Sequence, residues 1–441
     1  MAEPNNQVVQ PSAKALLPFA LFLALFVGTG IVLTQQDTAY AFYQLPAPVA
    51  IIPAIILALW FNKGPLSDSL NTFMAGAGQN TIMTMCLIYL LAGAFSTVAE
   101  ATGGVEATVN LGLALLPEPF ILPGIFIIAG FVATAMGTSM GTIAAIAPVA
   151  LGIAQSAGIN PALMAGAVLS GAMFGDNLSI ISDTTIAAAR TQGSSMRDKF
   201  RENLHIAVPA ALIALALFYG MQPDTTPPPA SPINWWLVLP YLTILLLAVV
   251  GLNVFVVLAV GIVLAGVIGF VQADYAVLQF TKDIYQGFTK MHEIFILSML
   301  IGGLSQLIKQ QGGLAYITQL CQILIHKLGS KQQQGVRATE SAMAGMVAVT
   351  NCCTANNTVS IIVCGDVARN LAQEQTISPK RSASLLDIFS CISQGLIPWG
   401  AQALLLGSSF ALAPMTVVAN SYYVMLLALA SVVSIVVGRR H

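Results

Sequence analysis

The chain has 441 residues, of which 56% are hydrophobic and only 8% are charged, with a formal net charge of −1. Soluble globular proteins carry roughly 25% charged residues, so a water-soluble core does not account for this composition. No basic patch indicates a nucleic-acid partner. The repeated apolar runs predict an all-α, polytopic membrane protein that uses the lipid bilayer as its solvent. The six cysteines form no CxxC pair, so we expect no disulfide framework and no cofactor.

The chain divides into two apolar halves, residues 1–222 and 235–441, joined by a Pro-rich stretch at 223–234. This stretch lacks Lys and Arg and predicts an extracytoplasmic linker. The first apolar segment has a core of about 19 residues, longer than that of a signal peptide, so we expect it to be retained. Two segments of mixed character, 63–80 and 273–290, predict interfacial helices.

Basic residues set the predicted orientation, because cytoplasmic loops of membrane proteins are enriched in Lys and Arg. Alternation through the apolar segments puts the basic clusters on one side of the membrane, with both termini in the cytoplasm. The clusters are Arg190, Arg197, Lys199 and Arg201; Lys309, Lys327, Lys331 and Arg337; Lys380 and Arg381; and Arg439 and Arg440. We therefore expect a multi-pass protein of the inner membrane of a bacterium.

The two halves share a pattern, in which G-x-x-S is followed by a Gly-Gly pair. The matching sets lie at a constant offset and are Gly93, Ser96, Gly103 and Gly104, and Gly302, Ser305, Gly312 and Gly313. The first Gly-Gly loop lacks basic residues and is therefore outside, whereas its counterpart is basic and inside. The halves thus predict inverted repeats with broken helices and re-entrant hairpins, which are typical of secondary transporters with a site near the membrane midplane.

Two polar interruptions of apolar segments occupy matching positions in the two halves. The first spans residues 137–142, and its polar residues are Thr138, Ser139 and Thr142. Its counterpart spans 351–358, with Asn351, Thr354, Asn356, Asn357 and Thr358. Side-chain oxygens and freed carbonyls suit Na⁺, whereas the N-terminal end of a half-helix suits an anion. The alternative is a polar contact between membrane helices.

A third interruption, GAMFGDNLSIISDTT at 171–185, carries two carboxylates, Asp176 and Asp183. They are accompanied by Asn177, Ser179, Ser182, Thr184 and Thr185. Ionisable groups inside a membrane are costly, and by default they indicate a functional site. This stretch therefore predicts one half of an ion and substrate site.

The fourth interruption is SCISQGLIPWGAQ at 390–402, with Asp387 just before it. Its polar residues are Ser393, Gln394, Trp399 and Gln402. No Lys or Arg stands next to Asp387 in the sequence, so this carboxyl should bind a cation or carry a proton. The alternative is a neutral, hydrogen-bonded structural acid.

These motifs resemble those of a known family. GDNLSIISDTT resembles the G-D-x-x-S-P-x-S-D-T-T signature of the NhaC family of sodium/proton antiporters, part of the ion transporter superfamily, and SQGLIPWGAQ resembles its second-half G-x-x-P-[WY] signature. Ile180 departs from the pattern, because many members have Pro there. The stretch 176–203 looks closest to the YuiF-like branch. The resemblance implies a Na⁺-dependent carrier that works by alternating access, with an elevator-like moving domain.

Two functions of a secondary transporter remain open at this point. One is Na⁺/H⁺ antiport, and the other is Na⁺-coupled transport of an amino acid or small organic acid. An intramembrane aspartyl protease is disfavoured, because Met173 and Phe174 replace the usual G-x-G-D environment and because Asp176 and Asp183 share one short segment. A channel would not need paired acids. We therefore expect no enzyme.

The sequence also suggests roles within the site. Asp183, Ser182 and Thr138 are the candidate Na⁺ ligands, assisted by Thr142 and Thr184. Asn356, Asn357 and Thr358 would form a pseudo-symmetric ion or substrate site in the second half. Asp176 and Asp387 are the candidates for proton coupling. Stretches of small residues would suit a homodimer interface.

Overall fold

The computed structural model describes residues 10–36, 44–62, 64–115, 117–180, 182–221, 233–272, 274–328 and 332–437. Within these residues all regular structure is helical, which confirms the all-α fold. Eight of the described helical segments are long and apolar enough to cross a membrane. The chain is therefore a multi-pass membrane protein. Most of the linker predicted at 223–234 lies outside the described residues.

The first half of the chain supplies η1 to α11, and the second half supplies α12 to α21. The first set is η1 (Ala13–Leu16), α1 (Leu17–Gln35), α2 (Ala47–Ala50), α3 (Ile52–Trp60), α4 (Leu66–Ala77), α5 (Asn80–Ala101), α6 (Gly104–Leu115), η3 (Glu118–Phe120), α7 (Ile121–Met136), α8 (Ser139–Ala157), α9 (Pro161–Leu178), α10 (Asp183–Gln192) and α11 (Met196–Gly220). The second set is α12 (Trp235–Val249), α13 (Val254–Gln272), α14 (Val277–Gln310), α15 (Gly313–Leu328), α16 (Gln332–Thr354), α17 (Asn357–Glu374), α18 (Pro379–Leu396), α19 (Ala401–Phe410), α20 (Pro414–Ala419) and α21 (Tyr422–Val437).

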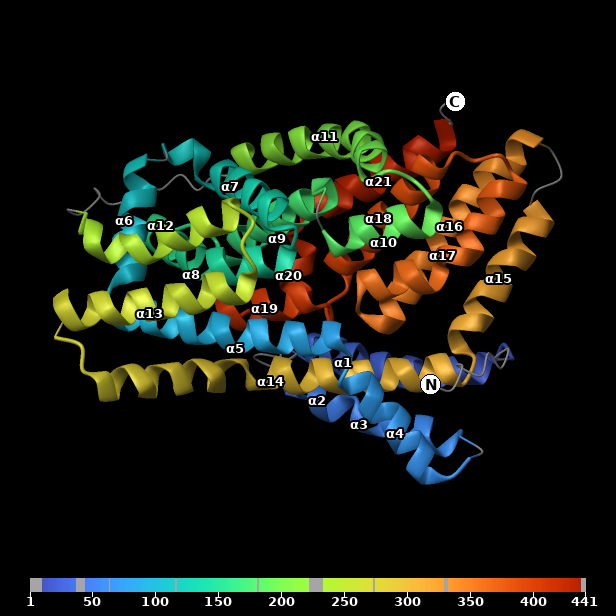
Figure 1. Ribbon diagram of the computed structural model, residues 1–441, viewed down its shortest axis with the longest axis horizontal. Coiled ribbons are helices and arrows are strands. Elements are labelled where there is room, and N and C mark those ends of the chain that lie inside the picture. Colours follow the sequence, from blue (N-terminus) through green and yellow to red (C-terminus); the bar gives the residue numbers. More distant parts are fainter. Residues whose placement is uncertain are drawn as a thin grey trace.

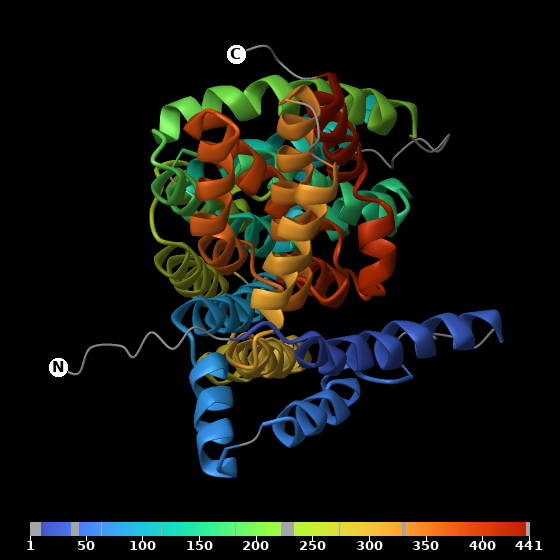
Figure 2. The same cartoon turned by 90° about the vertical axis from the view of Figure 1, so that its right-hand side faces the viewer.

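The helices fall into two parts. Figure 1 shows α14 running across the lower part of the molecule, with α5 above it and α2 to α4 below it, and a thicker block that includes α7 to α11 and α16 to α21 above them. The view turned by 90° shows α1, α3 and α4 extending away from this block (Figure 2). We call α1 to α5 with α14 the frame, and α7 to α11 with α16 to α21 the block.

Glycine contacts hold the frame together. Gly93 of α5 faces Gly287 of α14, and a Cβ on either would collide with the carbonyl oxygen of the other. Gly76 of α4 meets Gly302 in the same way. Small residues let helix backbones approach closely in a membrane, where van der Waals packing replaces the hydrophobic effect. The prediction of a separate interfacial helix at 273–290 is wrong, because α14 continues unbroken through Gly287 while α5 packs along it.

The helix breaks expected from the sequence are present in the block. Gly137 ends α7 in the left-handed region with φ +68°, and the Thr138 side chain then caps α8. At the matching position Ala355 has φ +49°, and Asn356 caps α17 by accepting from the Val359 amide. A side-chain cap satisfies one of the free amides at a helix start. Both half-helices therefore begin inside the protein, each capped by a polar side chain of its own break.

The other two breaks are extended turns. The residues that follow α9 and α18 have extended backbone, with ψ 139° at Ser179 and ψ 124° at Ile397. The elements that follow are exchanged between the halves. α10 packs against α17 and α18, and α19 packs against α8 and α9. The order of elements from α7 to α10 matches the order from α16 to α19. The boundaries and the inverted relation of the two repeats remain predictions.

Candidate ion and substrate site

The two helix breaks of the first half come together at Asp176. This carboxyl belongs to the last turns of α9 and is only 5% exposed. Ser139, the first residue of α8, donates from its hydroxyl to Asp176 Oδ2 at 2.7 Å, and its backbone amide lies 3.4 Å from the same oxygen. The N-terminal end of a helix favours negative charge. The start of α8 thus holds a buried carboxylate that α9 presents.

A chain of side-chain hydrogen bonds extends from Asp176 into the second half. Gln402 Nε2 donates to Ser139 Oγ at 2.9 Å, and Gln394 Nε2 donates to Gln402 Oε1 at 2.8 Å. Gln394 Nε2 also lies 3.3 Å from the carbonyl oxygen of Ala355. Asp176, Ser139, Ala355 and the two glutamines come from four different breaks. One hydrogen-bonded network therefore joins all four polar interruptions.

Some of the expected site residues connect the breaks instead of facing this network. Asn351 Nδ2 donates to the carbonyl of Ser390 at 2.9 Å, and Trp399 Nε1 donates to the carbonyl of Cys352 at 2.9 Å. Both bonds tie the end of α16 to the fourth break. Buried side chains that satisfy free carbonyls in this way fix the path of an irregular segment.

Four other polar groups at the breaks bond to their own segments. Thr142 Oγ1 donates to Thr138 O at 3.0 Å, Thr354 Oγ1 to Asn356 O at 3.2 Å, the Thr358 amide to Asn357 Oδ1 at 3.0 Å, and Ser393 Oγ to Phe389 O at 2.8 Å. Ser179 Oγ instead donates to the carbonyl of Thr134 in α7 at 3.1 Å. Such local bonds stabilise the ends of helices. Among the polar side chains at the breaks, Gln402 makes the bond between the halves, through Ser139, which in turn donates to Asp176.

The three predicted Na⁺ ligands lie in different surroundings. Ser182 accepts from the Thr185 amide at 3.2 Å and contacts the Thr184 hydroxyl at 3.1 Å, so it serves as the N-cap of α10. Asp183 follows it and is exposed, with no ion pair or hydrogen bond within the described part of the chain. Thr138 caps α8. The two carboxylates of the third break therefore face different surroundings, because Asp176 is buried and Asp183 is exposed.

Asp387 is fully buried and has a cationic partner. Lys199 Nζ lies 2.6 Å from Asp387 Oδ2, and both side chains are 0% exposed. Asp387 has no Lys or Arg beside it in the sequence but has one in space, and Lys199, which the sequence groups with a basic loop cluster, lies on a buried helix face. α11 begins at Met196, so its first turns already belong to the buried bundle. The partner is far away in the sequence and close in space.

Asn203 completes this second carboxylate site. It lies one helical turn after Lys199 on α11, and its Nδ2 donates to Asp387 Oδ2 at 2.8 Å and to the carbonyl of Asn177 at 3.1 Å. The sequence reading missed both α11 residues. The sequence does contain a signal for them. Lys199 and Asn203 are four residues apart and therefore lie on the same helix face as the apolar residues Ile206 and Ala210. That spacing indicates one buried face that starts before the apolar run.

A second buried ion cluster lies on the same block. Arg381 at the start of α18 forms a bidentate ion pair with Glu340 of α16. Its Nε donates to Oε1 at 2.8 Å and its Nη2 donates to Oε2 at 2.9 Å. Its Nη1 donates to Ser434 of α21 at 2.9 Å and lies 3.8 Å from Glu202 of α11. Two-pronged Arg–carboxylate pairs have fixed geometry. This cluster holds four helices of the block in one arrangement.

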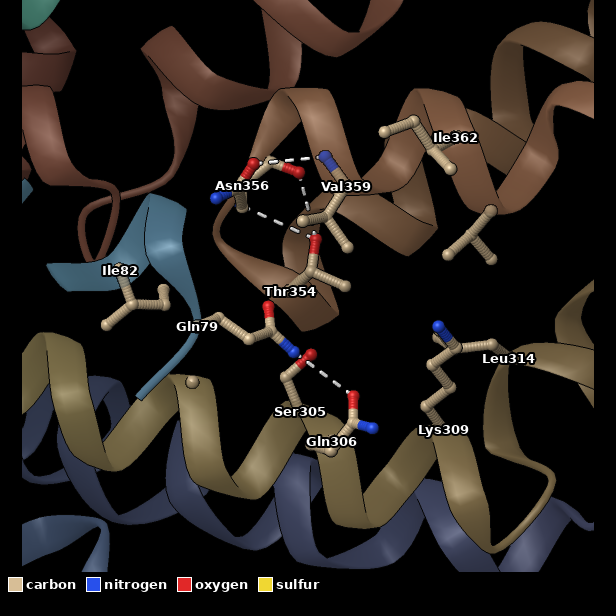
Figure 3. A pocket seen from close by; sticks show the side chains of 12 residues that line it. Gln79, Ile82, Ser305, Gln306, Lys309, Leu314, Thr354, Asn356, Val359 and Ile362 are labelled. Carbon is tan, nitrogen blue, oxygen red and sulfur yellow. Dashed lines mark hydrogen bonds between the residues drawn. The ribbon is translucent and has the colours of Figure 1, made fainter. Parts of the chain in front are cut away.

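A cavity reaches the second-half break from the side of the frame. It has a volume of about 260 Å³ and lies between α14 and the α16–α17 turn. Figure 3 shows Thr354 and Asn356 on one wall, with Ser305 and Lys309 of α14 opposite. Gln79 donates to Gln306 Oε1 at 3.2 Å beside them. The cavity therefore gives one of the four breaks a polar approach at the boundary between frame and block.

The donor set at the site consists of hard oxygen and amide groups. Among the described residues, no group of three or more His, Cys, Asp or Glu side chains could hold a metal ion. Carboxylate, hydroxyl and carbonyl oxygens prefer hard cations. In secondary transporters, freed carbonyls and broken helix ends at the midplane coordinate Na⁺ or protons. The site fits a small, exchangeable cation better than a resident transition metal.

Comparisons with known proteins agree with this chemistry. Residues 9–221 match the model of the Na⁺/H⁺ antiporter family. The chain is 24% identical to the Na⁺/H⁺ antiporter NhaC of Bacillus subtilis, over 96% of this chain and 98% of that one. It is 26% identical to the Na⁺/H⁺ antiporter NhaC of Alkalihalophilus pseudofirmus, over 88% of both chains.

Among solved structures, the YdaH transporter of Alcanivorax borkumensis aligns with a TM-score of 0.42 and 14% identity, over 97% of this chain and 98% of that one. The finer resemblance to the YuiF-like branch remains a prediction. The family model matches the first half of this chain, and the two curated antiporters align with it over 88% of its length or more, so the chain is similar to Na⁺/H⁺ antiporters.

Proposed function

We propose that this protein is a Na⁺/H⁺ antiporter that works by alternating access, with Asp176 as the group that binds Na⁺ and protons in turn. The observation that carries the proposal is the hydrogen-bonded network that joins Asp176 to all four helix breaks. A carboxylate that exchanges its cation in this position is coupled directly to the segments that would rearrange when access changes.

The partners of the buried carboxylates Asp176 and Asp387 support this assignment. Asp387 is neutralised by Lys199 at 2.6 Å. Asp176 forms no ion pair within the described residues, and Ser139 donates to it through hydroxyl and amide. An unpaired carboxylate inside a membrane needs a counter-charge. Either Na⁺ or a proton supplies that charge, and competition between the two on one group gives exchange.

The sequence alone predicts Na⁺ binding at Asp183, Ser182 and Thr138. The geometry favours a different division of roles. Because the hydroxyls of Ser182 and Thr138 cap helices and Asp183 is exposed, we place Na⁺ at Asp176 and assign Asp183 the attraction of cations toward the third break. An exposed charge of this kind acts through its field and is weakened by salt.

The proposed motion is of the elevator type, in which the block moves against the frame. The cavity between α14 and the α16–α17 turn supports this proposal, since it lies at the boundary between the two parts. We place the protein in the inner membrane of a bacterium, with Na⁺ and H⁺ as its transported ions. A homodimer remains an expectation from the sequence.

Proteoliposomes with an internal pH dye test the function. A Na⁺ pulse should move protons across the membrane in the unmodified protein without any organic solute. Asp176→Asn should abolish this response, because the amide cannot exchange a proton for Na⁺. Asp68→Asn on the exposed side of α4 is the matched control and should retain full activity. Retained exchange in Asp176→Asn would remove this residue from the mechanism.

The same vesicles test the alternative substrate class. The amides and hydroxyls at the four breaks outnumber what one Na⁺ needs, which is the observation that favours an amino acid or small organic acid. If Na⁺ enters only after an amino acid or organic acid is added, then antiport as the main function is wrong. A proton response to Na⁺ alone, unchanged by these solutes, supports antiport.

A further inference from the structure

The ammonium group of Lys199 lies in a complete shell of oxygen atoms. Its Nζ is 2.6 Å from Asp387 Oδ2, 2.9 Å from the carbonyl oxygen of Asn177 and 2.7 Å from Thr185 Oγ1. These three oxygens come from α18, the end of α9 and α10. The lysine itself enters from α11 and is 0% exposed. Four helices of the block therefore meet at one buried positive charge.

Asp387 and its neighbour Asn203 also carry oxygen atoms that the ammonium does not satisfy. Asp387 Oδ1 and Asn203 Oδ1 are buried and have no hydrogen-bond partner within the described part of the chain. Unpaired buried acceptors are rare, because each loses its hydration without compensation. The side chains around Lys199 thus offer more acceptor oxygens than a single ammonium group uses.

The types of oxygen are those that bind a hard cation. The set consists of one carboxylate, one carbonyl and one hydroxyl. The carbonyl belongs to Asn177, in the last turn of α9, where the helix ends in the bundle. Carbonyls at the C-terminal ends of broken helices carry partial negative charge and coordinate Na⁺ in transporters. An ammonium group and Na⁺ carry the same charge and seek the same oxygens.

We infer that the shell formed by Asp387, Asn177 and Thr185 is a second cation site whose permanent occupant is the side chain of Lys199. The tethered ammonium keeps Asp387 neutralised in every step of transport, and it excludes free Na⁺ from this position. Of the two buried carboxylates near the helix breaks, Asp176 and Asp387, only Asp176 then exchanges ions. Lys199 is therefore a positioning residue that limits the number of ions carried in each cycle.

The inference makes a specific prediction for a chain that lacks this ammonium. Lys199→Ala leaves the shell with an uncompensated buried carboxylate, which destabilises the fold strongly. Na⁺ should enter the vacated position and restore the charge balance. Stability should then depend on Na⁺ in a way that it does not when Lys199 is present, because a ligand that binds only the folded state stabilises it.

The experiment uses the Asp176→Asn background, so that the proposed transport site does not contribute to Na⁺ binding. Thermal unfolding of the detergent-solubilised protein is followed in NaCl and in choline chloride at equal ionic strength. Asp176→Asn alone should give the same melting temperature in both salts. Asp176→Asn/Lys199→Ala should melt a few degrees higher in NaCl, and ²²Na⁺ binding should rise from none to about one ion per chain.

Three further variants separate this site from a general effect of salt or charge. Adding Asp387→Asn to Lys199→Ala should abolish the Na⁺ response, because the central carboxylate is lost. Lys199→Arg should keep a buried cation and show no Na⁺ response. Lys380→Ala removes an exposed lysine from the first turn of α18 and should also show none.

Two results would overturn the inference. One is a Lys199→Ala chain that folds and melts identically in NaCl and choline chloride. The other is a Lys199→Ala chain that fails to fold at any Na⁺ concentration, since Na⁺ is expected to replace the ammonium. If Asp176→Asn alone still responds to Na⁺, the proposed role of Asp176 fails, whereas the effect of adding Lys199→Ala still decides the present inference.

Discussion

At the scale of single residues, the buried carboxylates Asp176 and Asp387 differ in the groups that face them in the structure. Each sits near a helix break in an apolar segment, and each was a candidate for proton coupling. Asp176 faces a hydroxyl and an amide at the start of α8, whereas Asp387 faces Lys199. The sequence could single out both acids, but the pairing depends on α11 crossing α18, which no local pattern encodes.

Glu340 offers a prediction about the stability of the block. Replacing it by Ala leaves the guanidinium of Arg381 buried without its two-pronged partner. Breaking a buried ion pair by removing one member costs about 3–5 kcal/mol, so the melting temperature of Glu340→Ala should fall clearly. Glu374→Ala is the control, because Glu374 is exposed at the end of α17. Equal melting temperatures for the two variants would show that Arg381 finds another partner.

At the scale of elements, the helix breaks were the most predictable feature. Glycines and hydroxyl residues between apolar runs identified the turns at Gly137 and Asn356, because these residue types favour left-handed backbone and helix caps. The break at Ser179 forms even though Ile180 replaces the Pro of the resembled signature. Ser182 and Thr185 stabilise it instead, through the N-cap of α10.

The length of α14 was harder to predict for a physical reason. The stretch before Met291 contains charged and polar residues, which suggested a separate helix at the membrane surface. In the structure this stretch continues as one helix, since Gly287 packs closely on α5. Asp283 is buried and accepts from the Tyr275 hydroxyl at 2.6 Å and from Gln279 Nε2 at 2.8 Å. Both features are tertiary, and the local pattern does not contain them.

Gly287→Ala tests the close contact between α5 and α14. The added methyl group would collide with the backbone of Gly93, so we expect the helices to separate locally and the melting temperature to fall. Gly345→Ala is the matched control within α16, because nothing lies within 4 Å of a Cβ at that position. It should stabilise the helix by about 0.5–1 kcal/mol. A neutral Gly287→Ala would show that the frame tolerates a wider crossing.

At the scale of the whole molecule, the contacts within the block differ from those between the block and the frame. Within the block, buried ion pairs and hydrogen bonds tie helices of both halves, including Gln192 of α10 to Ser382 of α18 and to the carbonyl of Gly365 in α17. Between frame and block lies the cavity that reaches Thr354 and Asn356. The proposed movement of the block along α5 and α14 would break the contacts between frame and block, such as the bond from Ser408 Oγ to the Lys290 carbonyl, and keep those within the block.

Cross-linking tests that motion. Cysteines at Ile82 of α5 and Val359 of α17, which both line the cavity, should arrest transport when joined by a bismaleimide reagent. A second pair at Gln192 and Ser382, whose side chains are in hydrogen-bond contact, lies within the block, and closing it as a disulfide should leave transport unchanged. Both pairs are placed in a chain freed of its native cysteines. Full activity after cross-linking Ile82 to Val359 would contradict an elevator-type movement.

The exchange of α10 and α19 between the halves has a consequence for biosynthesis. α10 reaches its packing partners only after α17 and α18 have been made, and α8 and α9 lack α19 until later still. A chain whose synthesis has stopped at the linker therefore has neither the Gln402 bond to Ser139 nor the Lys199 bond to Asp387. We expect such a nascent chain to sit in the membrane without an ion site, so that a cell makes this carrier without leaking Na⁺ or protons on the way.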